Sequence, residues 1–272
     1  MNRDHDSETA LKLLRRLSTF DGLKSFSVDL IYGRPNQTSK DWENEITRLL
    51  ETLPYLPHIS LYELTLERGT KLWKEASVHQ KVKLPSETEK ADLYEATVGT
   101  LKSFGLHQYE VSNFSRTAET QGQHNLWYWR GGNFLGIGPG AHGRYHRASN
   151  DRLSTVNIPS PNDWMASVEA TGRGLKRVER QSTFDVAAEL LATSLRTVLG
   201  LESDNLTRVT ASQLSVNDLV KGDPFCEAFV EKGTILVTDE RLWLSEAGMS
   251  LADYVTPYLM ANMRKKLGEK AP

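Results

Sequence analysis

Short apolar segments alternate with a helical pattern in the first part of the chain, and this alternation constrains the fold most. The segments 26–32 and 58–66 are short, apolar and bounded by turn residues, which is typical of buried strands. Between them, apolar residues recur at helical spacing from Trp42 to Leu53, and Pro54 ends the pattern. A strand–helix–strand order predicts parallel strands joined by crossover helices. Because only two such strands are present, we expect part of a β/α barrel and not a closed one.

Asp29 places a charge inside the first of these strands. A carboxylate in a buried strand is costly unless it is paired or faces a polar cavity. Side chains alternate along a strand, so Asp29 shares a face with Ser27 and Ile31. The loop that follows, residues 33–38, lies at the carboxyl end of the strand, where β/α barrels carry their active sites. Asp29 is therefore either a ligand-binding residue or one half of a structural ion pair with an arginine.

A polar segment follows the next predicted helix, which Ser86 and Glu89 begin as a capping box. The sequence from Gln108 to Phe114 has the pattern of one further strand, with Glu110 and Asn113 inside it. These two side chains either orient a ligand or satisfy buried backbone groups.

The segment 124–143, HNLWYWRGGNFLGIGPGAHG, joins polar and aromatic side chains to a glycine-dense loop. Glycines at this density allow positive φ angles or close approach of the backbone to a partner. In one interpretation His124 is a single axial imidazole on a haem, with aromatic side chains as its wall. In the other, this is a tight turn whose aromatics belong to the core. His142 and His146 have no cysteine or carboxylate nearby to complete a zinc-type site, so we do not expect one.

The rest of the chain predicts a small helical domain with a hairpin. Residues 150–161 are polar and turn-rich, and we assign 150–180 to a linker. A helix capped by Ser182 or Thr183, a capping box of Thr210 and Gln213, a hairpin over 235–244 and a final helix from Ser250 are expected. This order resembles a winged-helix module, but the hairpin turn is acidic and no basic stripe lies beside it, so no nucleic-acid partner is expected.

Composition narrows the possibilities further. The net charge is −2, and no apolar run is long enough to span a membrane. Cys226 is the only cysteine, which excludes a disulfide framework and any cluster held by several cysteines of this chain. Its aromatic neighbours at helical spacing favour a buried structural thiol over a nucleophile.

Six segments, taken in order, carry a specific resemblance to a known family. They are RDHDSETA, SVDLIYGRPNQT, HISLYELTLERGT, HQYEVSNFSR, HNLWYW and LGIGPGAHG. Together they resemble the radical S-adenosylmethionine family of oxygen-independent coproporphyrinogen III oxidases, in its haem chaperone branch. The resemblance runs from Arg3 to about Leu259, and HNLWYW matches the HNxxYW motif that this branch associates with haem.

The resemblance implies a fold and a set of binding residues. The fold is α/β: residues 1–149 form the second half of an incomplete radical SAM (β/α) barrel, and 181–263 form a winged-helix-like C-terminal domain before a tail, 264–272. Arg3, Asp29 and Thr65 (or its neighbour Leu64) would contact S-adenosylmethionine. The haem site would comprise His124, Asn125 and Tyr128, with His124 on the iron; no residue is assigned a catalytic role.

The chain departs from the family pattern in one respect. Family members carry a CxxxCxxC motif for a [4Fe–4S] cluster upstream of the matched segments, and this chain has no such motif. We therefore expect an amino-truncated form, whose own residues do not generate a radical. The implied function is a haem-binding chaperone that delivers haem to an unknown recipient. The alternatives are a coproporphyrinogen oxidase in a longer form and an inactive fragment. An intact animal protein would be mitochondrial, and a bacterial one, or one without a presequence, cytoplasmic.

Overall fold

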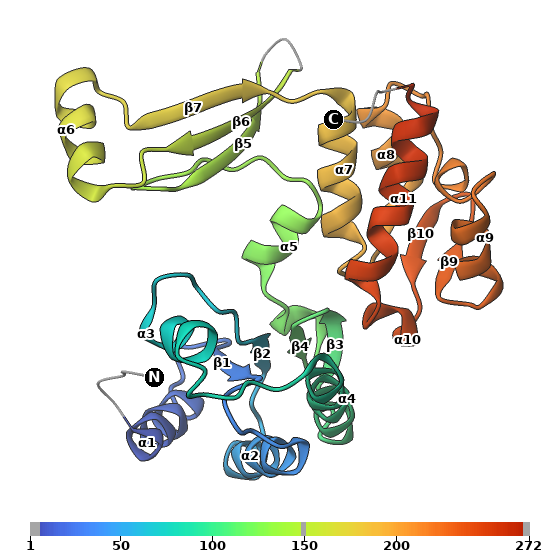
Figure 1. Ribbon diagram of the computed structural model, residues 1–272. Helices are drawn as coiled ribbons and strands as arrows, with labels where there is room; N and C mark the ends of the chain where they lie inside the picture. The colour runs from blue at the N-terminus through green and yellow to red at the C-terminus, as the bar shows by residue number, and fades with distance from the viewer. Residues whose placement is uncertain (1–5, 148–150, 269–272) are drawn as a thin grey trace. The chain divides into compact units, whose positions relative to one another are not determined.

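The computed structural model describes residues 6–147 and 151–268, and Arg3 lies outside them. The chain forms two compact units, Met1–Gly122 and Gln123–Pro272, which are described one at a time (Figure 1).

The first unit is a four-stranded sheet with helices against one face. Its elements are α1 (Ser7–Ser18), β1 (Ser27–Tyr32), α2 (Ser39–Thr52), β2 (His58–Glu63), α3 (Lys71–Trp73) with a π-helical turn (Lys74–Val78), α4 (Glu87–Ser103), β3 (His107–Glu110), β4 (Asn113–Ser115) and a 3-10 turn (Ala118–Thr120). The strand order is β1-β2-β4-β3, with β1 and β2 parallel as expected and the other two pairs antiparallel. The predicted helices at Ser7, Trp42 and Ser86 are confirmed, including the capping box of Ser86 with Glu89.

The single strand expected over 108–114 is wrong, because the chain reverses there. β3 and β4 form an antiparallel hairpin instead. Glu110 holds the turn: its Oε2 accepts hydrogen bonds from Ser112 N at 2.8 Å and from Asn113 Nδ2 at 2.6 Å. Glu110 and Asn113, predicted inside a single strand, therefore close a turn.

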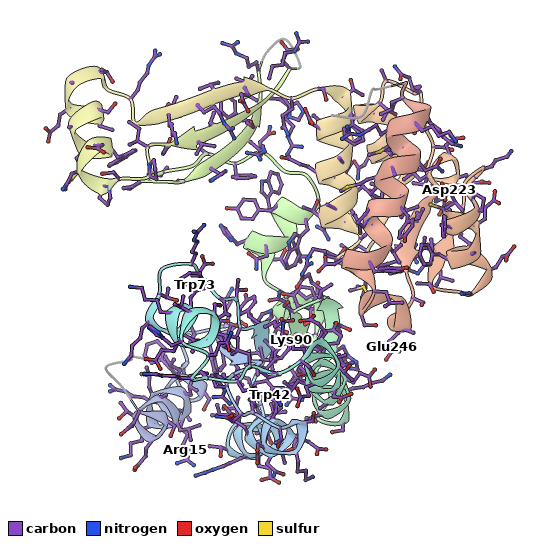
Figure 2. All side chains as sticks on the ribbon, in the orientation of Figure 1. Arg15, Trp42, Trp73, Lys90, Asp223 and Glu246 are labelled. Atoms are coloured by element: carbon purple, nitrogen blue, oxygen red, sulfur yellow. The ribbon has the colours of Figure 1, made fainter. Side chains whose placement is uncertain are left out.

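The two faces of this sheet differ in character. Side chains of alternate residues, such as Val28, Ile59 and Phe114, pack with α2 and α4 into the hydrophobic core. Trp42 of α2, labelled in Figure 2, is fully buried, and its Nε1 donates to Thr97 Oγ1 of α4 at 2.7 Å. The opposite face carries polar side chains, including those of Ser27, Asp29, His58 and Ser60, which the parallel register places side by side.

The second unit begins with a short helix and a three-stranded antiparallel sheet. These are α5 (Gln123–Trp129), β5 (His142–His146), β6 (Arg152–Asn157), α6 (Pro161–Thr171) and β7 (Leu175–Arg180), with strand order β5-β6-β7. Residues 151–180, expected to be a linker, instead form two strands and a helix of this unit. The strand β6 forms backbone hydrogen bonds with β5 on one side and with β7 on the other. This pairing stabilises a strand whose polar sequence did not indicate one.

The remainder of the second unit is helical with a small sheet, as predicted. It comprises α7 (Thr183–Ser194), β8 (Leu201–Glu202), α8 (Ser203–Val209), a 3-10 turn (Asn217–Leu219), α9 (Pro224–Glu231), β9 (Ile235–Val237), β10 (Arg241–Leu244), α10 (Glu246–Met249) and α11 (Ala252–Lys266). Ser182 caps α7 as expected. The capping box of Thr210 and Gln213 is wrong: Thr210 ends α8, and Ala211 and Ser212 have positive φ in the turn after it. The helix α11 also continues into the predicted tail, as far as Lys266.

Among the described residues, none of the helices combines the length and the apolar character that a membrane crossing requires.

Candidate functional site

A chain of hydrogen bonds crosses the polar face of the first sheet. His58 Nδ1 lies 2.7 Å from Ser27 Oγ, and His58 Nε2 lies 2.6 Å from Tyr109 Oη. The same Tyr109 oxygen accepts a hydrogen bond from Gly122 N at 2.9 Å. Burial lowers the pKa of His58, and the negative charge of Asp29 partly opposes this shift. The face therefore holds a neutral imidazole in fixed hydrogen bonds, a feature that the sequence pattern did not single out.

Asp29 lies on this face, opposite Ser60 in the parallel register, and its side chain is exposed. The structural ion pair with an arginine is not found for Asp29 among residues 6–147 and 151–268. Thr65 is exposed in the loop after β2. The backbone ladder continues to this point, because Leu64 N donates to Tyr32 O at 2.8 Å. Asp29 thus lies on β1, whereas Thr65 lies in the loop beyond the end of the neighbouring strand β2, and Arg3 is outside the described residues.

The three residues predicted for haem lie together on α5. His124 is exposed, and its Nε2 lies 2.6 Å from Tyr128 Oη, one turn further along the helix. The two rings meet edge to face, with centroids 4.5 Å apart. His124 Nδ1 lies 3.3 Å from Asn125 Oδ1. Both nitrogens of the imidazole are therefore engaged by side chains of its own helix, which fixes the orientation of the ring.

The glycine-dense loop after α5 folds back against this helix. Trp127 Nε1 donates to Asn133 O at 2.7 Å, and the rings of Tyr128 and Phe134 pack edge to face at 4.4 Å. A backbone bridge joins Phe134 to Arg144 on β5. Gly143 permits this contact, because a Cβ there would lie 2.6 Å from Thr155 Oγ1 and 3.0 Å from Gly136 N.

The alternative of a tight turn with core aromatics does not hold for Trp127, whereas Tyr128, Trp129 and Phe134 are half-buried. Trp127 is 57% exposed, and Leu135 and Ile137 in the loop are 71% and 88% exposed. Only Leu126 of α5 is buried. This segment therefore presents several apolar side chains to solvent, and His124 at its start is also exposed.

A charged network that the sequence did not reveal lies behind α5. Arg144 of β5 contacts Glu189 of α7 through Nε at 2.8 Å and Nη2 at 2.8 Å, and Arg152 of β6 approaches the same carboxylate at 3.7 Å. Together with Tyr128 and His142 they line a cavity of about 270 Å³. The partners are far apart in the chain, so no local pattern signals them.

A bound iron–sulfur cluster does not fit the described residues. Cys226 on α9 is fully buried, and burial, with the negative charge of Asp223, raises the pKa of its thiol to about 12. The expectation of a buried structural thiol is confirmed. No group of three or more histidine, cysteine or carboxylate side chains suited to a metal ion occurs in the part of the chain that the structure describes.

Comparison with known proteins places the chain in a group of relatives. No protein-family model matches it. It is 32% identical over 270 residues to "Radical S-adenosyl methionine domain-containing protein 1, mitochondrial" of Mus musculus, an alignment covering 97% of this chain and 59% of that protein. It is 38% identical over 144 residues to "Heme chaperone HemW" of Haemophilus influenzae, covering 53% of this chain and 35% of the chaperone. The chain thus spans about three fifths of the length of the mouse relative.

A solved structure shares the fold. The Escherichia coli coproporphyrinogen III oxidase HemN, described as a radical SAM enzyme, superposes with a TM-score of 0.72 at 19% identity, covering 95% of this chain and 59% of that one. The predicted α/β fold class is therefore confirmed. The chain is similar over most of its length to proteins named radical S-adenosyl methionine domain-containing protein 1, over part of it to proteins named heme chaperone HemW, and in fold to HemN.

Proposed function

We propose that this chain binds haem on the exposed face of α5 and acts as a haem chaperone. The observation that carries the proposal is the imidazole of His124, which is exposed and oriented by Tyr128 and Asn125, on a segment that also presents exposed apolar side chains. An imidazole on an apolar wall is a common donor set for haem iron. Relatives named heme chaperones support the same role.

The exposed position of this site suits transfer of the ligand. Cavities behind and beside α5 measure about 270 Å³ and 220 Å³, which is below the roughly 300–1,000 Å³ of clefts that enclose ligands of this class. A haem on His124 would therefore remain open to a recipient on one side, and Trp127, Leu135 and Ile137 are the exposed apolar side chains of this segment. His142 lines the larger cavity together with Tyr128 and is the competing imidazole.

Haem titration of the full chain tests the proposal. We expect a Soret band for the wild type that His124→Ala weakens strongly, because the iron loses its nitrogen ligand. His79→Ala, an exposed histidine of the first unit, is the matched control and should bind as the wild type does. His142→Ala should also leave the band in place. Unchanged binding by His124→Ala would exclude His124 as the ligand.

The polar face of the first sheet supports S-adenosylmethionine binding as a further part of the proposal. Asp29 is exposed there without an ion pair among the described residues, and Thr65 is exposed beyond β2. Calorimetric titration should detect binding that Asp29→Asn weakens. Oxidative decarboxylation of coproporphyrinogen requires cluster-holding thiolates that this chain does not contain, so turnover belongs to a longer form. The names of its animal relatives favour a mitochondrial location.

A further inference from the structure

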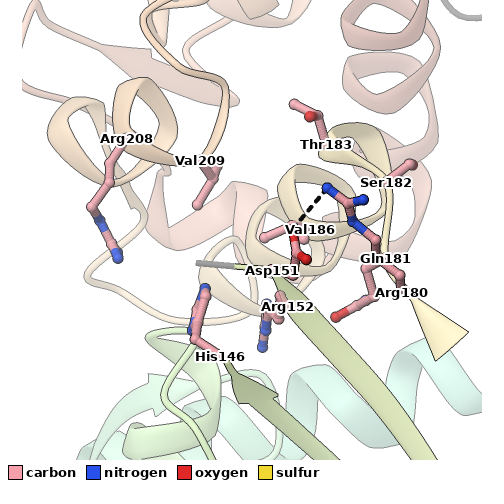
Figure 3. Close-up of a pocket in the computed structure, with 10 residues that line it drawn as sticks. All are labelled: His146, Asp151, Arg152, Arg180, Gln181, Ser182, Thr183, Val186, Arg208 and Val209. Atoms are coloured by element: carbon pink, nitrogen blue, oxygen red, sulfur yellow. Dashed lines mark ion pairs between the residues drawn. The ribbon is translucent and has the colours of Figure 1, made fainter. Parts of the chain in front are cut away.

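A second cavity in the second unit is lined by an excess of positive charge. It measures about 230 Å³ and lies where β5, β6 and β7 meet the first turn of α7 and the end of α8. Three guanidinium groups line it, those of Arg152, Arg180 and Arg208, against the single carboxylate of Asp151. Figure 3 shows Asp151 joined to Arg180, at 2.7 Å. The positive charges of Arg152 and Arg208 are therefore not balanced within the lining.

Arg152 is the least satisfied of these groups. Its side chain is 6% exposed, and its Nε, fully buried, has no hydrogen-bond partner among the described residues. Glu189 does not account for it, because Arg144 already holds that carboxylate closely and Arg152 stands 3.7 Å away. A buried donor without a partner is destabilising, so an acceptor is expected at this point.

Two further side chains indicate which chemical groups a ligand of this cavity needs. Gln181 Oε1, on the same lining, is also buried without a partner, so the cavity offers an unused acceptor beside its unused donor. His146 is held neutral, since burial and then the charges of Arg152 and Arg208 lower its pKa. The residues Ser182 and Thr183, at the start of α7, also line the cavity, and the positive end of the helix dipole favours an anion there.

We propose that this cavity binds a phosphate group. A hydrogen phosphate supplies oxygen acceptors for Arg152 and Arg208 and an O–H donor for Gln181. A carboxylate or a sulfate at neutral pH lacks that donor. The site is separate from α5 and does not depend on haem binding.

The test is a titration of the full chain with inorganic phosphate, followed by NMR of the His146 ring. Around this ring stand Arg152 on β6, Arg208 on α8, Arg180 on β7 and Asp151, with Asn133 Oδ1 2.9 Å from Nδ1. A bound anion adds negative charge, so we expect a saturable shift and a higher His146 pKa. Affinity should be about tenfold lower in Arg152→Gln, and sulfate should bind several-fold more weakly than phosphate.

Arg208→Gln keeps the experiment decisive if Arg152→Gln fails to fold, because Arg208 is exposed. It should weaken phosphate binding about threefold. Arg173→Gln, an exposed arginine between α6 and β7, is the matched control and should bind normally. Titration with glycerol 3-phosphate distinguishes the source: tighter binding than phosphate indicates an ester, weaker binding the free ion. Absence of a saturable His146 shift, wild-type affinity in Arg208→Gln, or equal affinity for sulfate would overturn the proposal.

Discussion

Tyr128 Oη lies 2.6 Å from His124 Nε2, the ring nitrogen that points away from the neighbouring Asn125 contact. The phenol therefore occupies the position that an iron atom would take on this nitrogen. Tyr128 also packs against Phe134 of the following loop. The ring of Tyr128 therefore connects the imidazole of His124 to that loop. Haem binding at Nε2 requires the tyrosine to release the histidine.

Removal of the Tyr128 hydroxyl should therefore tighten haem binding. Tyr128→Phe keeps the ring and its contact with Phe134 but frees Nε2, and a net hydrogen bond of about 1 kcal/mol corresponds to about fivefold in affinity. The measurement is a Soret titration of both proteins. Weaker binding by Tyr128→Phe would show instead that the phenol contributes to the haem site.

The buried hydrogen bond between Trp42 and Thr97 stabilises the first unit. Thr97→Val conserves volume but leaves the indole N–H without its acceptor, so we expect the free energy of unfolding to fall by about 1–3 kcal/mol. Urea denaturation measures the change. Thr97→Ser restores the hydroxyl and should recover most of the loss; equal losses in the two variants would assign the effect to packing.

The first unit should lose stability in mild acid because of His58. Burial lowers the pKa of this imidazole in the folded state, so below about pH 6.5 the unfolded chain binds the proton more readily. The stability is present above the unfolded pKa and falls as pH decreases, by at most about 1.4 kcal/mol for each pH unit. Hydrogen exchange of β1 and β2 amides measures this slope, and His58→Gln should flatten it even though it also removes two hydrogen bonds.

Cys226 should resist thiol reagents while the second unit is folded. A pKa raised to about 12 leaves roughly a thousandth of the thiolate that an ordinary cysteine has near neutral pH. Labelling with a chromogenic disulfide should be slow in buffer and rapid in denaturant. Rapid labelling of the native protein would contradict the burial of this side chain.

Local signals in the sequence predicted the starts of two long helices, although the capping box expected at Thr210 is wrong. The capping boxes at Ser86 and Ser182 involve residues three apart, and both helices begin where these residues indicate. His124, Asn125 and Tyr128 are likewise close in sequence, so a single helix brings them together. The grouping of these residues was predictable; whether they bind haem stays a prediction.

The errors and omissions come from turns closed by local polar side chains and from contacts between segments far apart in the chain. Glu110 closes a hairpin through bonds to its own turn, and a strand pattern does not distinguish this from a continuous strand. Arg144 and Arg152 meet Glu189 only because β5, β6 and α7 come together in the fold. The paired hydrogen bonds that make β6 a strand also come from segments on either side of it. None of these contacts produces a periodic pattern of apolar residues in the sequence from which it could be predicted.

The division of the first sheet into an apolar and a polar face has an evolutionary consequence. Along β1, Val28 and Tyr32 contribute to the core, whereas Ser27 and Asp29 lie on the other side and contribute little to packing. Neighbouring positions of the strand are therefore constrained differently. The residues that face the core must preserve side-chain volume, whereas the residues on the polar face can change in chemistry without loss of core packing. A family built on such strands can acquire new ligands by substituting every second residue.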